Sequence, residues 1–99
     1  MSTLEERFAA RLWDAVEKTR ELGYNPQRFA NSLEVTDAMH LARTLVSTGE
    51  LHDGFQEVVS MGHPELTLES IMLEAEFSPL FSSQHLAAAR WRLDQAIAP

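Results

Sequence analysis

Residues 65–86 read Glu-Leu-Thr-Leu-Glu-Ser-Ile-Met-Leu-Glu-Ala-Glu-Phe-Ser-Pro-Leu-Phe-Ser-Ser-Gln-His-Leu, and this stretch decides the fold. Thr67 precedes apolar residues at helical spacing, and its hydroxyl can accept a hydrogen bond from an N–H group of the first turn. That helix must end before Pro79, and Ser82 or Ser83 then caps a last helix. Three large apolar side chains lie between the two helices: Phe77, Leu80 and Phe81. They predict a turn that is packed under the helices.

Similar signals divide the rest of the chain into helices. Thr3 with Glu6 fits a capping box, Gly23 fits the left-handed position after a helix, and Thr36 is predicted to cap the third helix. No stretch alternates with the period of two that is typical of a strand. The sequence therefore predicts an all-α fold, a compact bundle of five to six short helices in a single domain over residues 1–99. We expect the helices at about residues 4–22, 26–33, 37–47, 53–61, 67–75 and 83–97.

The composition is that of a small acidic globular protein. The chain has a net charge of −7 and no cysteine, which excludes disulfides, zinc–thiolate sites and thiol chemistry. No apolar run approaches the length that spans a membrane, and the N-terminus lacks the pattern of a signal peptide, so we expect a cytoplasmic protein. The negative charge argues against nucleic acid and against an anionic membrane as partners, and it is compatible with a basic protein.

From Tyr24 onward, the order of short motifs is similar to that of a known group of proteins. The matching residues are Tyr24, Pro26 and Phe29, then Gly54-Phe55, Met61-Gly62, Leu66-Thr67-Leu68-Glu69, Pro79-Leu80-Phe81-Ser82, Ala89-Arg90 and Leu93. Together they resemble a small helical module that occurs in many uncharacterised bacterial proteins, alone or at the end of larger ones. The chain departs from the pattern at Met61-Gly62-His63-Pro64, where an arginine is expected after the glycine. The family has no established activity, so the resemblance implies no catalytic or binding residues.

Residue types that carry chemistry are present, but they do not form a recognisable site. The histidines are scattered, without a pair at the spacing of metal ligands on a helix: His40, His52, His63 and His85. Ser82 and Ser83 lie near His85 but lack the pattern of a nucleophile elbow, and no phosphate-binding glycine loop occurs. Acid–base catalysis by paired carboxylates needs a cleft, for which a domain of this size leaves little room beside its core. We therefore expect no catalytic, cofactor or metal site.

The two tryptophans lie away from the apolar stripes of their helices. In the last helix the stripe that we expect to face the core is Leu86, Ala89, Leu93 and Ile97. Each indole is either packed where its helix is covered on a second side, or is part of an interface, where indoles are enriched. Arginines flank the second tryptophan on both sides. The sequence thus suggests a protein interface formed by Trp13, Arg90, Trp91 and Arg92.

The leading hypothesis is a non-enzymatic protein-interaction module or small accessory subunit, whose partner is another protein or a second copy of the chain. An alternative is an acidic inhibitor that mimics nucleic acid and blocks a DNA- or RNA-binding protein. Its phosphate mimics would form an acidic patch: Glu65, Glu69, Glu74 and Glu76. A second alternative is a helix-turn-helix DNA-binding protein built from the third and fourth helices, which the negative charge disfavours.

Overall fold

The protein was analysed as a computed structural model, which describes residues 3–47 and 53–97. Helices form where apolar stripes lie between capping residues and glycine or proline. The described residues form six α-helices and two short 3-10 helices: α1 (Leu4–Glu21), α2 (Gln27–Val35), α3 (Ala38–Ser47), α4 (Asp53–Ser60), η1 (Pro64–Leu66), α5 (Leu68–Met72), η2 (Ser78–Leu80) and α6 (Ser83–Ile97). No strand occurs among these residues, and the predicted all-α class is confirmed.

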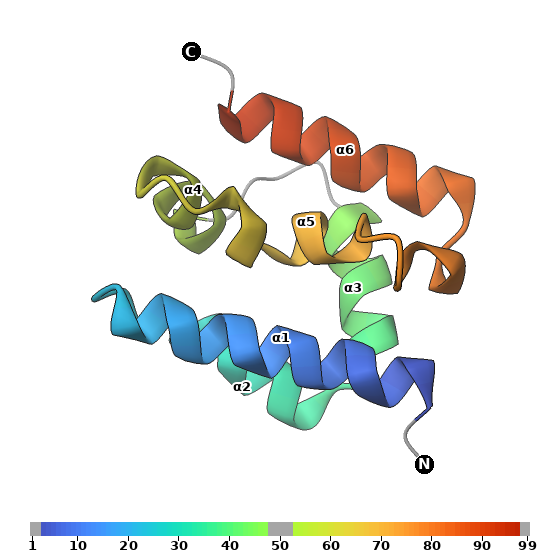
Figure 1. The fold of residues 1–99 in the computed structure, drawn as a ribbon, viewed down its shortest axis with the longest axis horizontal. Coiled ribbons are helices and arrows are strands. Elements are labelled where there is room, and N and C mark those ends of the chain that lie inside the picture. Colours follow the sequence, from blue (N-terminus) through green and yellow to red (C-terminus); the bar gives the residue numbers. More distant parts are fainter. Residues whose placement is uncertain (1–2, 48–52, 98–99) are drawn as a thin grey trace.

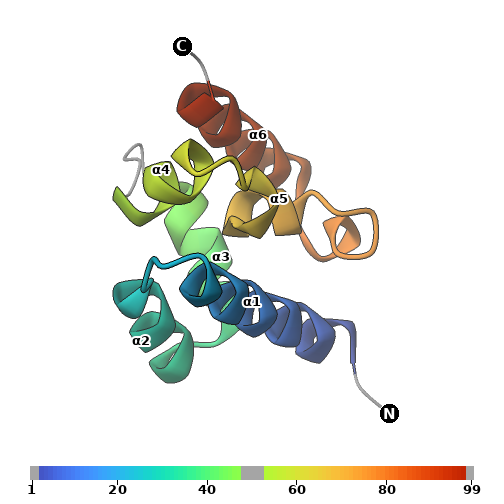
Figure 2. The same cartoon turned by 60° about the vertical axis from the view of Figure 1, so that its left-hand side comes forward.

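The two outer helices, α1 and α6, lie on opposite sides of the molecule, with α3 and α5 between them (Figure 1). Helix α6 packs on α5, α3 and α4, whereas α1 packs on α3, η1 and α5. Helix α2 lies beside α1 and packs on α3 (Figure 2). The helices thus form three tiers, and α6 is covered by other helices on one side.

The predicted packed turn is present between α5 and α6. The Thr67 hydroxyl accepts a hydrogen bond from the Ser70 N–H (3.2 Å) and caps α5, and η2 then carries the chain towards α6. Phe77 and Phe81 are both buried, and their rings meet the ring of Phe8 in α1 edge-on, with centroid distances of 5.5 and 5.3 Å. Such edge-on pairs add about 0.5–1.5 kcal/mol each to the burial of the rings. The turn therefore joins α1 to the C-terminal half of the chain.

The helix bounds depart most from the predicted ones at α5, which ends at Met72 instead of residue 75. The backbone tightens there, because the Leu73 N–H donates to the Ser70 carbonyl (3.2 Å) and the Glu74 N–H to the Ile71 carbonyl (3.1 Å). This tightening turns the chain early and lets the following aromatic residues reach α1. The predicted end of the third helix at residues 48–49 lies outside the described residues.

Most of the predicted helix ends are confirmed, and one cap is corrected. The Thr3–Glu6 capping box is present, and Gly23 has a φ of 98°. The predicted cap at Thr36 is wrong, because α3 begins at Ala38 and the residue before it, Asp37, accepts the hydrogen bond from the His40 N–H through Oδ2 (3.1 Å). Aspartate and threonine are both common caps, so the sequence alone does not separate these neighbours.

Candidate functional site

Helix α6 has one buried side and one exposed side. Ala89 and Leu93 are buried, as the predicted stripe requires. Ile97 is 56 % exposed, so its predicted burial is wrong; it lies in the last turn of α6, which no described element covers at this position. The buried side instead includes a charged residue, Arg92.

Arg92 is fully buried and cannot contribute to a surface, which corrects its predicted place in the interface. Its Nε donates to Glu69 Oε2 at 2.6 Å, and its guanidinium lies 5.7 Å from the centre of the Phe55 ring. Residues two positions apart on a helix point about 200° away from one another, so Arg90 and Arg92 lie on opposite sides of α6. The signal was available in the sequence, because Arg92 is three residues after Ala89 on the buried stripe.

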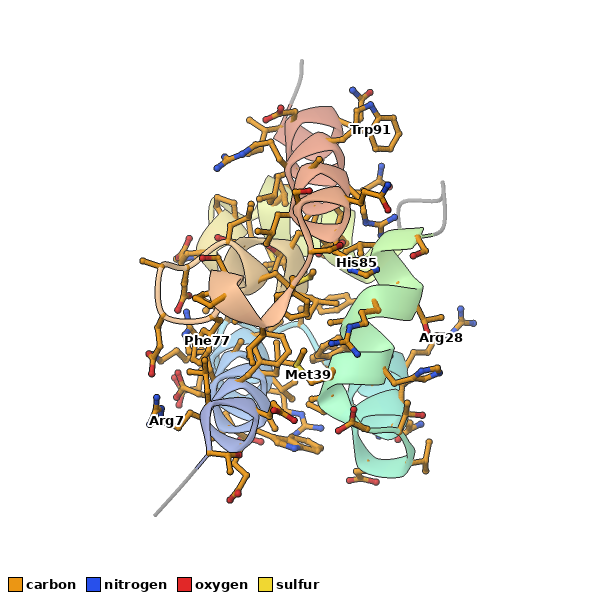
Figure 3. All side chains as sticks on the ribbon, turned by 90° about the vertical axis from the view of Figure 1, so that its right-hand side faces the viewer. Arg7, Arg28, Met39, Phe77, His85 and Trp91 are labelled. Carbon is orange, nitrogen blue, oxygen red and sulfur yellow. The ribbon has the colours of Figure 1, made fainter. Side chains whose placement is uncertain are left out.

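Trp91 lies on the exposed side of α6, with half of its surface exposed (50 %). Side chains on a helix lean towards its N-terminus, so the indole lies over the turn that contains Ala87 and Ala88. Those small side chains can cover little of the ring. Figure 3 shows Trp91 projecting outward from α6. The indole is therefore accessible to another molecule.

Arg90 is also exposed, and it makes no ion pair within residues 3–47 and 53–97. By contrast, all four cationic side chains of α1 are in ion pairs with carboxylates: Arg7, Arg11, Lys18 and Arg20. Of the predicted interface, Arg90 and Trp91 are thus the two residues that are exposed next to one another on α6.

Trp13 is partly buried and packs against the hydrophobic core. The sequence left open whether Trp13 packs in the core or forms part of an interface. Packing against the core explains why part of this indole is buried. Trp13 lies on α1 and Trp91 on α6, the two outer helices on opposite sides of the molecule. The structure therefore does not bring the two tryptophans together into one surface.

The acidic patch is not a set of free carboxylates. Three of its members pair at the surface with bases of the same chain: Glu65 with His63 (2.9 Å), Glu74 with Arg11 (3.1 Å) and Glu76 with Arg7 (3.0 Å). The fourth, Glu69, is buried with Arg92, so its predicted place in a surface patch is wrong. The bases come from segments up to 69 residues away, which is why the sequence suggested unneutralised acids.

The contact of Glu65 with His63 also affects the protonation of the Glu65 carboxyl. The hydrogen bond between His63 Nδ1 and Glu65 Oε1 is the main reason why the pKa of the Glu65 carboxyl lies below its usual value. The carboxylate is therefore held in its charged, paired form.

The residues weighed as catalytic or metal-binding candidates have structural roles or lie apart. Ser82 Oγ accepts a hydrogen bond from the His85 N–H (3.2 Å) and so caps α6, and it lies 2.9 Å from His85 Nδ1. No group of three or more His, Cys, Asp or Glu side chains in the described part of the chain is placed to hold a metal ion. His52 lies outside the described residues.

Comparisons of the chain with protein-family models, with curated proteins and with solved structures gave no match. The resemblance suggested by the motifs from Tyr24 onward therefore stays an expectation. None of the described helices is long and apolar enough to cross a membrane.

Proposed function

We propose that the protein is a cytoplasmic, non-enzymatic protein-interaction module that binds its partner through the outer side of α6, with Trp91 as the anchor and Arg90 beside it. The observation that carries the proposal is the half-exposed indole on a helix whose opposite side is buried. Tryptophan and arginine are among the residues that most often dominate binding energy at protein interfaces.

The chemistry of this surface favours a partner that covers an aromatic ring. An exposed indole offers a large apolar area, and the neighbouring guanidinium can pair with a carboxylate or carbonyl of the partner. With Arg92 buried, only one cation flanks the indole at the surface. The apolar contact should therefore supply most of the affinity, and binding should persist at high ionic strength.

The two alternative functions have less support. A nucleic-acid mimic needs an array of accessible acids, whereas the acids proposed for it are paired within the chain or buried. A DNA-binding helix-turn-helix would need a basic surface, and the chain has a net charge of −7. Both alternatives predict binding that weakens steeply with salt, which separates them from an indole-centred contact.

The test compares the parent protein with Trp91→Ala and with Val35→Ala. Val35 is 83 % exposed on α2, so the second variant is a matched control that removes an exposed apolar side chain elsewhere. Sedimentation velocity detects self-association, and quantitative capture from the native cell at 0.1 and 0.5 M salt, between which the Debye length falls from about 10 to about 4 Å, detects another partner. We expect one partner that is retained by the parent and by Val35→Ala and reduced about tenfold or more by Trp91→Ala.

The proposal is wrong if neither a second copy nor any captured protein depends on Trp91. Truncating a half-exposed side chain should change the free energy of unfolding little, and urea titration of both variants checks that the fold is intact.

A further inference from the structure

A pocket of about 670 Å³ lies between the C-terminal half of α1, the start of α2 and helix α4, with residues 66–69 on a further wall. Its volume falls within the roughly 300–1,000 Å³ that is usual for small-molecule sites. It is separate from the Trp91 surface, since neither Trp91 nor Arg90 lines it.

The walls of this pocket are mainly apolar and come from several elements. Leu12 and Val16 contribute from α1, Phe29 from α2, Phe55 and Val58 from α4, and Leu68 from α5. Because these side chains offer no hydrogen bonds, water in the pocket is held weakly and an apolar molecule can displace it. The pocket therefore suits an apolar body.

Three buried polar side chains interrupt the apolar walls: Thr19, Thr67 and Glu69. The Thr19 hydroxyl donates to the Ala15 carbonyl (2.7 Å), and the Thr67 hydroxyl donates to the Pro64 carbonyl (2.7 Å). Both hydroxyl donors are thus already used by the backbone. A ligand can donate a hydrogen bond to the third group, the side chain of Glu69, without breaking a hydrogen bond from a hydroxyl to the backbone.

Glu69 is 3 % exposed and is one of the residues that line the pocket. The structure records one hydrogen bond to it, from Arg92 Nε to Oε2. An ionised carboxylate has about four lone-pair sites, so it can accept further hydrogen bonds. The contact with Arg92 also fixes the carboxylate in one orientation, which lowers the entropic cost of binding a donor.

We propose that this pocket binds a mainly apolar, uncharged molecule that carries one hydroxyl or N–H donor, with the donor bonded to the Glu69 carboxylate. The ion pair with Arg92 already neutralises Glu69, so a cationic ligand gains little. Arg92 itself does not line the pocket, and the cation among the lining residues is Arg28, which is exposed and would attract an anionic ligand instead.

The test uses three probes that share a naphthalene ring, measured by chemical-shift titration of the backbone amides. 2-Naphthol supplies a hydroxyl donor, 2-methoxynaphthalene has no donor, and 2-naphthoate carries a negative charge. We expect saturable binding of 2-naphthol with shifts centred on the pocket walls. A hydrogen bond to a charged acceptor should make 2-methoxynaphthalene bind about tenfold more weakly or worse. Equal or tighter binding of either other probe overturns the assignment to Glu69.

A matched pair of variants on α2 tests the location without disturbing the buried ion pair. Ser32 is half-buried on the pocket wall, so Ser32→Phe places a ring where the probe would bind. Val35→Phe places the same ring at an exposed position outside the pocket. We expect the first variant to reduce the affinity for 2-naphthol at least tenfold and the second to leave it unchanged. Equal binding by the two variants, or no saturable binding by the parent, overturns the proposal.

Discussion

The α1 side of the molecule and the outer side of α6 use their charged groups differently. On the α1 side, Arg7 and Arg11 bind Glu76 and Glu74, so that these two acids are already paired within the chain. On the outer side of α6, Arg90 is beside a half-exposed indole and has no ion pair among the described residues. A basic partner would have to replace these ion pairs to reach the two acids, whereas a partner at Arg90 would have no ion pair among the described residues to replace. The abundance of acids in the sequence is thus a poor guide to where a partner binds.

The largest effect that would test this contrast is expected within α6 itself. Replacing Arg92 with Met leaves Glu69 buried without its partner, and breaking a buried pair in this way costs about 3–5 kcal/mol. The same change at Arg90, two residues earlier on the exposed side, should alter the free energy of unfolding by no more than about 0.5 kcal/mol. Urea unfolding of Arg92→Met and Arg90→Met measures both values.

A double variant separates the effect of the two charges from the effect of the volume that the two side chains fill. Arg92→Met combined with Glu69→Leu removes both charges, and apolar replacement of a buried pair is often neutral or stabilising. We expect it to recover most of the stability lost in Arg92→Met. Similar stabilities for Arg92→Met and Arg90→Met would contradict the division of α6 into a buried and an exposed side.

The positions of the helices could be predicted from the sequence because their signals are local. The Thr67 cap depends only on neighbouring residues and is observed, whereas α5 ends at Met72, before Pro79, which lies in η2. The spacing from Ala89 places Arg92 on the buried side of α6, but its residue type argues against burial, and its partner Glu69 is 23 residues away in the sequence. The pairing of Glu76 with Arg7 spans 69 residues and depends on how α1 packs on the rest of the chain. Local chemistry therefore predicts the helices, and tertiary packing decides which charges and indoles remain available.

A smaller effect is expected for the pair of Arg11 and Glu74 on the α1 side. Their side chains are 24 % and 34 % exposed, and partly exposed pairs contribute about 0.2–1 kcal/mol. A double-mutant cycle with Arg11→Met and Glu74→Gln should give a coupling energy in this range, and added salt should reduce it. Absence of coupling at low salt would mean that these charges are not neutralised by one another, and the acidic surface would again be open to a basic partner.

The smallest effect is expected at Glu65, where the change concerns protonation more than stability. Its pKa is lowered in the folded state, so its contribution to stability is present above the pKa of the unfolded chain and is lost as the pH falls through the folded pKa. Because both side chains of the pair are well exposed, that contribution is small. Carboxyl NMR titration measures the midpoint directly, and His63→Ala should raise it towards the ordinary value for glutamate.

Glu57 in α4, which makes no ion pair within the described residues, is the internal reference for this measurement. The hydrogen bond from His63 is the main cause of the lowered pKa, whereas the charge of Arg11 acts in the same direction more weakly. A Glu65 midpoint that does not move in His63→Ala would contradict this order of causes and would mean that the backbone hydrogen bond at Glu65 holds the carboxylate in its charged form.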